Sequence, residues 1–599
     1  MFASPAVDAE RRADGTWLLH STDPLAGHDP VVLTSLRRWA AADPDSPLIA
    51  ERDPSGGWRT RTYGAVAAAA ESIGQALLGL GLGPAKPLLV LSGNSVDHLV
   101  ISLAAMTAAV PVVPISTAYS LQSKDHARIR QLAELVRPGA VFAQDAEEFS
   151  AALDALGGLT EIASSGRRAA SVMLADLESV RPGPQIAAAF ASIKADSIAK
   201  ILFTSGSTGA PKGVLNTHGM LSANQQMIRQ VWPFLRSQRP VVVDWLPWSH
   251  TFGGNHNVNM VLVAGGTLYV DSGRPAAGLF GPTVANLADV PPTIYFNVPA
   301  GYARLVPVLE ADPEFARRFF SRLRLIFNAA AALPPSLRQR LSDVAARTTG
   351  RKIPVTAAWG LTETAPAVTS AHFEYDDPAC IGVPLPGAEV KLSPVQEAYE
   401  IRARGPMVTP GYFERPDLTA QAFDEEGFYR TGDAVRLVDA DHPERGLVFQ
   451  GRIAEDFKLT TGTFVRVGAV RTALLSAMPL LADAVIAGEG REFVCALGWL
   501  SPDQARTLPA QDAAAGDVIT DQIVLGRLTA ALRDSQQGSG SASRVERLIV
   551  MKRPADLDAG EITDKGYVNQ RRVLRNRADL VELLYAEPLA PGVVVRGRI

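Results

Sequence analysis

The chain has 599 residues, of which 47% are hydrophobic and 20% are charged, and its formal net charge is -4. A chain this long and this apolar exceeds one ordinary domain, so we expect at least two domains with sizeable cores. The slightly acidic balance, with no long run of Lys or Arg, excludes a bulk attraction to nucleic acid or acidic membranes. Small molecules are therefore the expected partners.

The cysteine count and the apolar windows indicate the compartment. Only Cys380 and Cys495 occur, neither of them in a metal-ligand spacing, so a disulfide framework is not expected and a reducing compartment fits. Residues 1–10 turn acidic before any signal-like apolar stretch, and the apolar window 99–115 is interrupted and short for a membrane span. We expect a cytoplasmic protein.

The N-terminal region alternates between amphipathic helical patterns and short apolar runs. Helices are predicted at 31–41, 63–80 and 95–108, with strands at 87–91 and 110–114. This alternation predicts an α/β fold with a parallel sheet covered on both faces. Gly79, Gly81 and Gly83 follow a helix rather than a strand, so they mark a helix end and not a dinucleotide fingerprint.

Residues 201–214 combine an apolar strand end, a hydroxyl-rich and glycine-rich turn, and a lysine. Gly206 and Gly209 leave backbone N–H groups open to a phosphate, and Pro211 stiffens the exit. A surface turn is the alternative, but the density of donors favours a polyphosphate. It is not a Walker loop, because two residues separate Gly209 from the lysine. The side-chain donors are Thr204, Ser205, Ser207, Thr208 and Lys212.

Three later strand ends carry further candidates. The strand from 241 ends in a loop with two tryptophans, His250 and paired glycines, where a histidine in an arbitrary protein is more often structural. The strand 323–328 ends at Asn328 and enters an alanine-rich turn with Ala330; alanine allows a flat ring to approach but excludes backbone angles that only glycine tolerates. The strand 353–358 leads into Trp359, Gly360, Thr362 and Glu363.

Glu363 offers a hard oxygen ligand for magnesium, and Trp359 offers a stacking face. The alternative is a helix that begins at a Thr362 cap with Glu363 in its first turn.

Beyond residue 387 the pattern changes to short strands and turns, which predicts an antiparallel β-subdomain. Asp433 is placed in a glycine-containing turn, where its carboxylate can accept two hydroxyl protons. A small domain with strands at 484–487, 493–497 and 547–551 and a helix at 521–533 follows, and Gly/Ser-rich residues 536–543 fit a flexible loop.

These motifs resemble, in order, those of the adenylate-forming superfamily, which includes acyl-CoA synthetases, luciferases and peptide-synthetase adenylation domains. The resemblance rests on the run 201–214, on Trp-Gly-Leu-Thr-Glu at 359–363, on Tyr-Arg-Thr-Gly-Asp at 429–433 and on Gly451-Arg452 with the following stretch. It implies a large adenylation domain over 1–450 and a mobile α+β domain over 451–599, hinged at Ala454. It also implies ATP, Mg²⁺ and CoA as cofactor and co-substrates.

By this resemblance Glu363 binds Mg²⁺, while Lys212, Thr362, Glu363 and Lys565 are catalytic. His250, Asn328 and Ala330 border the acid pocket. The ATP and AMP contacts would be Thr204, Ser205, Gly206, Ser207, Thr208, Gly209, Lys212, Trp359, Gly360, Thr362, Asp433 and Arg452.

The chain departs from the family pattern at three places. Tryptophan replaces the usual tyrosine at 359, and Ala454 replaces a polar hinge residue, so the expected polar hinge contacts are missing. Lys565 is shifted from the usual lysine spacing, which falls nearer Tyr567, and Lys552 is the other lysine in the closing segment.

Within the superfamily the strings at 244–256, 451–459 and 561–567 look most like bacterial feruloyl-CoA synthetases of aromatic acid catabolism. A medium-chain fatty or other aryl acyl-CoA ligase is the alternative, since it needs the same motifs. An adenylate-binding protein without turnover is an alternative of another class. The oligomeric state is open, with a homodimer as one option.

Overall fold

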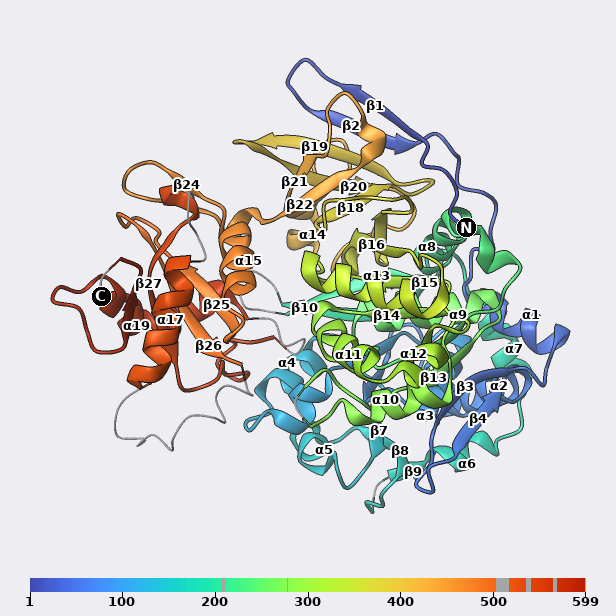
Figure 1. The fold of residues 1–599 in the computed structure, drawn as a ribbon. Coiled ribbons are helices and arrows are strands. Elements are labelled where there is room, and N and C mark those ends of the chain that lie inside the picture. Colours follow the sequence, from blue (N-terminus) through green and yellow to red (C-terminus); the bar gives the residue numbers. More distant parts are fainter. Residues whose placement is uncertain are drawn as a thin grey trace. The chain divides into compact units, whose positions relative to one another are not determined.

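Figure 1 shows a computed structural model of the chain, which describes residues 1–169, 171–205, 211–276, 278–501, 517–534, 540–563 and 568–597. Two compact units can be distinguished by their internal contacts. The first comprises 1–397, 401–431 and 437–448, and the second comprises 398–400, 432–436 and 449–599. Each unit is described by itself below.

A seven-stranded sheet lies in the first unit. Its order is β11 (Pro211–Thr217), β10 (Ile198–Ser205), β6 (Val112–Ile115), β5 (Leu88–Leu91), β7 (Ala140–Asp145), β8 (Thr160–Ser165) and β9 (Ser171–Met173). All pairs are parallel except β10 with β11. Every residue of β5 and β6 is buried, as expected for strands covered on both faces. The predicted parallel sheet is confirmed.

Helices accompany this sheet at the predicted places. α2 (Tyr63–Gly79) packs on α3 (Val96–Thr107), whose N-cap Ser95 accepts a hydrogen bond from the His98 backbone. α8 (His218–Val231) follows β11 and is capped by Thr217, which accepts from the Met220 N–H. The other helices of this half are α1 (Thr34–Ala42), η1 (Ala118–Gln122), α4 (Ala127–Val136), α5 (Ser150–Leu156), α6 (Leu174–Glu178) and α7 (Pro184–Ser192).

A four-stranded sheet has the order β12 (Val241–Asp244), β13 (Thr267–Val270), β3 (Pro47–Arg52) and β4 (Trp58–Thr62). Between β12 and β13 the chain forms a π-helix, η3 (Thr251–Asn257), which continues into α9 (Val258–Ala264). A plain loop was expected after β12, so the helical part of this segment corrects the prediction. Nearby helices are η2 (Pro233–Arg236) and α10 (Gly281–Asp289).

An eleven-stranded sheet begins with the N-terminal hairpin and ends with three parallel strands. Its order is β1 (Val7–Arg11), β2 (Trp17–Ser21), β19 (Glu389–Val395), β20 (Ala398–Arg404), β21 (Tyr429–Leu437), β22 (Leu447–Arg452), β18 (Cys380–Pro384), β17 (Ala367–Ser370), β16 (Val355–Gly360), β15 (Leu325–Asn328) and β14 (Ile294–Asn297). β14, β15 and β16 are parallel, and β16 pairs antiparallel with β17. The predicted antiparallel strands therefore continue a sheet that starts in the α/β region.

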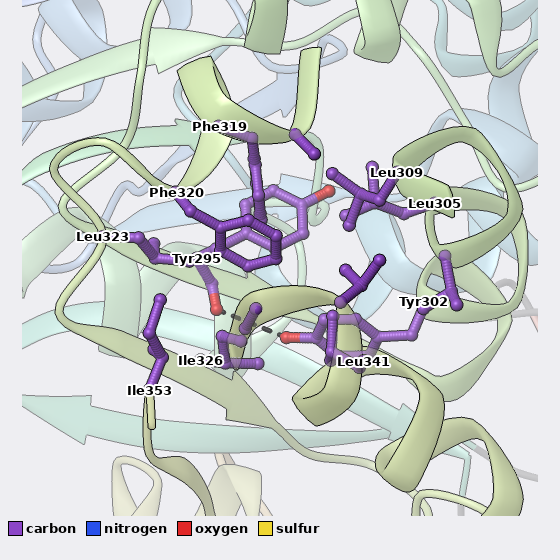
Figure 2. Close-up of a cluster of buried hydrophobic side chains, with 14 of the residues drawn as sticks. Tyr295, Tyr302, Leu305, Leu309, Phe319, Phe320, Leu323, Ile326, Leu341 and Ile353 are labelled. Carbon is purple, nitrogen blue, oxygen red and sulfur yellow. Dashed lines mark hydrogen bonds between the residues drawn. The ribbon is translucent and has the colours of Figure 1, made fainter. Parts of the chain in front are cut away.

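An aromatic and aliphatic core fixes the parallel end of that sheet. Figure 2 shows Tyr295, Phe319 and Phe320 packed together under the helices α11 (Pro299–Ala311), α12 (Pro313–Phe320) and α13 (Pro335–Thr349). The Tyr302 hydroxyl donates to the Phe327 carbonyl at 2.7 Å, and Asn297 Nδ2 donates to the Tyr295 hydroxyl at 2.9 Å. Burial of each such side chain contributes about 1.5–3 kcal/mol. The core thereby holds the carboxyl ends of β14 and β15 in place.

The second unit contains a four-stranded sheet with the order β25 (Leu481–Ala487), β26 (Val494–Leu500), β27 (Val545–Met551) and β28 (Val593–Val595). Two separate apolar clusters pack on it. The first includes residues of α15 (Val467–Ala477) and α17 (Gln522–Asp534), and the second includes residues of α18 (Gln570–Asn576) and α19 (Ala578–Tyr585). Alternation of the buried positions on β25–β27 explains why both faces are covered.

The remaining elements are short connections. In the described part of the chain, no helix combines the length and the apolar composition that crossing a bilayer requires. The short elements are η4 (Thr362–Thr364), α14 (Pro416–Ala422), η5 (Pro443–Arg445), η6 (Ile453–Glu455), β23 (Phe457–Lys458), β24 (Phe464–Val465) and η8 (Ser541–Ser543).

Candidate functional site

The predicted phosphate loop connects two antiparallel strands. Ser205 at the end of β10 faces Pro211 at the start of β11, and Thr204 faces Lys212 one pair further in. The backbone on both sides of the connection is thus fixed by a sheet ladder. Residues 206–210 lie outside the described residues, and with them the predicted Gly206, Ser207, Thr208 and Gly209.

Lys212 and Glu363 both contact Tyr412, a residue that the sequence does not single out. The Lys212 ammonium lies 5.1 Å from the centre of the Tyr412 ring, and the Tyr412 hydroxyl donates to Glu363 Oε1 at 3.2 Å. Tyr412 is held there because residues 411–413 run beside β11, with Phe413 N donating to Gly213 O at 2.7 Å. Lys212 and Glu363, which are 151 positions apart in the sequence, are thereby joined through one tyrosine.

The missed tyrosine carries little signal in the sequence. Tyr412 follows Gly411 between two predicted strands, and a single aromatic residue there has no chemical signature of its own. Burial, and secondly the charge of Glu363, raise the pKa of Tyr412 well above its usual value. The hydroxyl therefore stays protonated at neutral pH and remains a donor to the carboxylate.

Glu363 is buried in the turn after β16, with 8% of its surface exposed. Its carbonyl accepts from the Thr409 N–H at 2.8 Å, which ties η4 to the segment before Tyr412. The helix alternative is right in placing Glu363 in the first turn of a short helix, η4, but wrong about the cap, because the N-cap position is Leu361 and Thr362 is the first helical residue. The hydroxyl that accepts from the Leu361 N–H at 2.8 Å belongs to Thr364. Thr362 and Glu363 therefore sit together in one short turn.

No group of three His, Cys, Asp or Glu side chains that could hold a metal ion occurs among the described residues. Glu363 is a buried carboxylate to which no cation is paired in the described part of the chain. One protein carboxylate completed by water and substrate phosphates is a usual arrangement for Mg²⁺. The donor set around Glu363 fits that ion and not a closed protein cage.

Trp359 and Gly360 end β16 immediately before this turn. Trp359 is buried and pairs with Thr369 of β17, while Gly360 pairs with Ala367. A side chain at Gly360 is excluded, since an added Cβ would stand 1.8 Å from the Pro366 carbonyl oxygen. The backbone of β16 comes so close to residues 366–367 that only glycine fits at position 360.

Asn328 and Ala330 lie at the carboxyl end of β15, beside the end of β16 in register. Asn328 Nδ2 donates to the Ala331 carbonyl at 2.7 Å, and its buried Oδ1 has no partner among the described residues. Ala330 has φ of 73°, in the left-handed region that glycine favours. The expectation that alanine would avoid such an angle is therefore wrong here, at a cost of about 1–2 kcal/mol.

His250 occupies the N-cap position of η3 and is half-buried. Its carbonyl accepts from the Gly254 N–H at 2.7 Å, which starts the π-helical turn. The paired glycines are required by close approach, because a Cβ at Gly254 would stand 2.3 Å from the Trp248 carbonyl oxygen. π-Helical turns are rare and occur often at functional sites.

An aromatic cluster links η3 to the strands that carry Asn297 and Asn328. The Phe252 ring lies 5.6 Å from Phe327 and 6.3 Å from Phe296, centre to centre. Trp245 Nε1 also donates to Asn297 Oδ1 at 3.3 Å. The segment that carries His250 is therefore packed through Phe252 against the ends of β14 and β15.

A buried lysine, Lys200, supports the same π-helix from β10. Its Nζ donates to the Gly254 carbonyl at 2.7 Å, and this is its only hydrogen bond within the described residues. Burial lowers the pKa of Lys200 to about 8. His98 and His218 are its titratable neighbours, and for both of them burial first, with a smaller contribution from the Lys200 charge, lowers the pKa to about 4.

In the second unit, Asp433 and Arg452 form an ion pair with Nε and Oδ1 2.9 Å apart. Asp433 lies within β21 rather than in the predicted turn, because the left-handed Gly432 bends the strand without ending it. The carboxylate is buried while half of the arginine side chain is exposed. The two residues predicted to contact ribose and phosphate thus meet each other.

The predicted hinge residue Ala454 lies in η6, immediately after Arg452 and Ile453. Its side chain makes no polar contact, but its carbonyl accepts a hydrogen bond from Arg571, so the hinge is not without polar contacts as expected. Lys565 lies outside the described residues. Lys552, the alternative lysine, has a buried Nζ with no partner in the described part of the chain.

A family model described as AMP-binding enzyme matches residues 36–413, well over half of the chain. The chain belongs to the AMP-binding enzyme family. The match to the AMP-binding enzyme model includes Lys212, Glu363 and Tyr412, and it ends before Asp433 and Arg452.

Relatives of this AMP-binding enzyme align over about half of its length or more. The long-chain-fatty-acid–CoA ligase FadD15 of Mycobacterium bovis is 24% identical over 586 residues, which cover 91% of this chain and 95% of that protein. The mitochondrial malonate–CoA ligase ACSF3 of Mus musculus is 28% identical over 326 residues, covering 49% and 53%.

A solved structure of the anthranilate CoA ligase AuaEII in complex with anthranoyl-AMP is similar at a TM-score of 0.69 and 20% identity. It covers 94% of this chain and 99% of that one. The likeness shows the fold of the AMP-binding enzyme, a mixed α/β structure with a large N-terminal domain and a smaller C-terminal domain.

Proposed function

We propose that the protein joins an aryl carboxylic acid, a hydroxycinnamate such as ferulate, to CoA in an ATP-dependent reaction. The protein is an AMP-forming acyl-CoA synthetase that acts through an acyl-adenylate. The acid oxygen bonds to the α-phosphorus of ATP as the bond to the pyrophosphate leaving group breaks. The CoA thiolate then attacks the acyl carbon, and AMP leaves with the electron pair of the broken C–O bond.

The observation that carries this proposal is the grouping of Lys212, Tyr412 and Glu363 at the root of a hydroxyl-rich hairpin. A cation and a carboxylate that both contact one tyrosine suit a polyphosphate with its magnesium ion, since the cation meets phosphate oxygens and the carboxylate meets the metal. No ion pair joins Lys212 to Glu363 in the described part of the chain. Both charges therefore stay available to a ligand.

We propose the remaining contacts with ATP for four residues that the structure describes. Thr362, adjacent to Glu363, would contact the α-phosphate, and Trp359 would border the adenine. Asp433 would hold the ribose hydroxyls, and Arg452, already paired with it, would support the ribose or a phosphate. Mg²⁺ held by Glu363 would supply charge stabilisation for the phosphate oxygens.

The acid specificity rests on the region between η3 and β15. Phe252 packs on Phe327 between the segments that carry His250 and Asn328, and an aromatic environment suits a flat aryl acid. Medium-chain fatty acids and other aryl acids are the alternative, because an apolar wall accepts them as well and FadD15 is named a long-chain-fatty-acid–CoA ligase.

The test is pyrophosphate release from the full chain with ferulate, coumarate, caffeate, benzoate, octanoate and decanoate, each with and without CoA. We expect the highest specificity constant with a hydroxycinnamate, and thioester only when CoA is present. A higher constant for octanoate or decanoate would refute the hydroxycinnamate assignment and leave the ligase class intact. Binding of ATP without pyrophosphate release for any acid would favour an adenylate-binding protein without turnover.

We also propose that Lys565 bridges the acid and the α-phosphate during adenylation, and that the domain from residue 451 rotates between the two half-reactions. A lysine that serves only adenylation gives separable defects. Lys565→Ala should block acyl-adenylate formation and spare thioester synthesis from supplied acyl-adenylate, measured in single turnovers. Equal losses in both halves, or an adenylation loss in Lys552→Ala alone, would remove Lys565 from this role.

A further inference from the structure

A pocket with four arginines lies in the first unit, built by segments that the proposed reaction does not use. It has a volume of about 280 Å³ and is lined by Arg38 and Trp39 of α1, Arg229 of α8, Ala264 of α9, and residues 235–239. The three helices among these segments are labelled α1, α8 and α9 in Figure 1. The arginines that line it are Arg38, Arg229, Arg236 and Arg239.

Trp39 organises two of these arginines. Its Nε1 donates to the Val263 carbonyl at 3.2 Å, which holds the indole against the end of α9. The Arg239 guanidinium lies 4.7 Å from the Trp39 ring centre and the Arg38 guanidinium lies 5.4 Å from it. Stacking on one rigid ring fixes both cations at a shared wall.

The other two arginines have no acidic partner. Asp43 pairs with Arg239 at 2.6 Å and Asp29 lies 3.8 Å from Arg38, but no carboxylate forms an ion pair with Arg229 or Arg236 in the described part of the chain. Burial, and secondly the charges of Arg38 and Arg236, lower the pKa of Arg229. The cations in this pocket therefore repel one another.

The C-termini of two helices offset only part of the positive charge in this pocket. α8 and α9 both end here, and each C-terminus contributes about half a negative charge that favours a nearby cation. The four arginines carry four positive charges, and the two aspartates and two helix ends together carry about three negative charges. A surplus of about one positive charge remains. The whole chain has a net charge of -4, so the surplus is local and not a general property of the surface.

We propose that this four-arginine pocket binds a phosphate group of a small anion. Guanidinium forks bind phosphate oxygens in pairs, and a mono- or dianion would offset the surplus charge and the repulsion between the arginines. The volume is at the lower end of the range for ligand pockets, which suits a phosphate or a small phosphorylated compound rather than a nucleotide. The phosphate could belong to a free compound or to a lipid headgroup.

The experiment is calorimetric titration of the full chain with inorganic phosphate at constant ionic strength. We expect saturable binding that weakens at least about tenfold in the Arg229→Gln/Arg236→Gln variant, since the variant removes two charged donors to the phosphate oxygens. The matched control is Arg317→Gln/Arg322→Gln, which removes two exposed arginines of and beside α12 and should bind as wild type does. Lys212→Ala should also retain binding, which separates this pocket from the proposed ATP site.

A conservative variant and a vesicle arm complete the test. Arg229→Lys/Arg236→Lys keeps both charges without the fork and should bind with intermediate affinity, which shows that any loss in the glutamine variant is not a folding defect. Flotation with phosphatidate vesicles, compared with neutral phosphatidylcholine vesicles, tests the lipid source. Binding to phosphatidate vesicles alone would assign the phosphate to a headgroup. Equal binding of wild type and the glutamine variant in both assays, or no binding in either, would overturn the proposal.

Discussion

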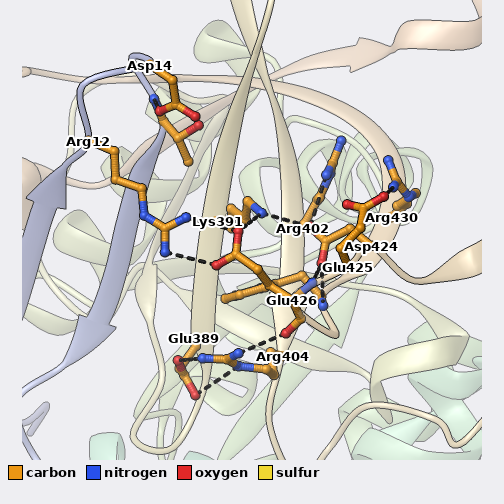
Figure 3. A network of polar contacts seen from close by, with 12 residues as sticks. Arg12, Asp14, Glu389, Lys391, Arg402, Arg404, Asp424, Glu425, Glu426 and Arg430 are labelled. Carbon is orange, nitrogen blue, oxygen red and sulfur yellow. Dashed lines mark hydrogen bonds and ion pairs between the residues drawn. The ribbon is translucent and has the colours of Figure 1, made fainter.

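Two buried lysines of the first unit differ in the partners that surround their ammonium groups. Lys391 on β19 has its Nζ 3.0 Å from Asp424, and Figure 3 shows the surrounding network, in which Arg402 and Arg12 share the neighbouring carboxylates. Lys200 on β10 is as deeply buried and meets only the Gly254 carbonyl among the described residues. One charge is compensated by acids and the other is not.

The pKa values of the two lysines differ accordingly, which indicates that the two residues have different roles. Burial lowers the pKa of Lys391, but hydrogen bonds to Glu426 and Asp424 outweigh it and the pKa is raised. For Lys200 burial acts alone and the pKa falls to about 8. Glu363 resembles Lys200, because it too is buried without an opposite charge in the described residues. Uncompensated buried charges destabilise a fold, so their place beside the candidate site indicates function.

The largest expected effect comes from removing the compensated lysine. Lys391→Met leaves the buried Asp424 without one of its two cationic partners and should lower the free energy of unfolding by about 3–5 kcal/mol. Activity per folded molecule should be retained. Urea unfolding followed by fluorescence measures the loss. An unchanged unfolding midpoint would show that the network does not need this lysine.

The next effect concerns the uncompensated carboxylate. Glu363→Gln keeps the size of the side chain and removes its charge, so ATP–pyrophosphate exchange at limiting Mg-ATP should fall at least about a hundredfold. The free energy of unfolding should stay the same or rise, since an unpaired buried charge is lost. A wild-type exchange rate in both Glu363→Gln and Lys212→Ala would reject the proposed ATP site.

Lys200→Met should lower the activity with the acid substrate. Without the Nζ donor the Gly254 carbonyl loses its hydrogen bond to β10, and we expect η3 and with it His250 to shift. We expect kcat/KM for the acid to fall about tenfold, with KM for ATP unchanged. Steady-state kinetics with each substrate varied in turn gives both values. A loss confined to the KM for ATP would contradict a role through η3.

The pKa shift of Lys200 also predicts how the free energy of unfolding changes with pH, and in which direction. The folded-state pKa of Lys200 is about 8 against 10.5 in the unfolded chain, so protonating it costs folding energy. The cost is absent above about pH 10.5, grows as the pH falls to 8, and is constant below that. Wild type should therefore lose stability relative to Lys200→Met between these values, by up to about 1.4 kcal/mol per pH unit. The difference in unfolding free energy between wild type and Lys200→Met, measured by urea unfolding, should differ between pH 8 and pH 9.5. The same difference at both pH values would contradict the prediction.

The sequence predicts those elements that local pattern controls. The apolar runs at 87–91 and 110–114 become β5 and β6, and the helices at 63–80 and 95–108 become α2 and α3 within two residues of their ends. Buried parallel strands and amphipathic helices each have a strong periodicity, which explains the agreement. The Thr-Glu turn and the strand end at Asn328 were likewise placed by the apolar run that precedes each.

The parts that sequence did not predict depend on long-range contacts or on backbone that breaks a local rule. Tyr412 joins Lys212 to Glu363 only because residues 411–413 pair with β11, a contact that no local pattern encodes. The π-helix at η3 is stabilised by Lys200 from another element, and Ala330 takes a left-handed angle because the end of β15 requires it. Asp433 stays in a strand despite the glycine before it.

The central claim is that the acid is activated by transfer of AMP. The most direct measurement is the identity of the nucleotide product when the full chain, ATP, Mg²⁺, ferulate and CoA are incubated together and separated by chromatography with mass detection. We predict AMP and pyrophosphate in equal amounts with the CoA thioester, and an acyl-adenylate when CoA is omitted. Formation of ADP and phosphate with the thioester would contradict the claim.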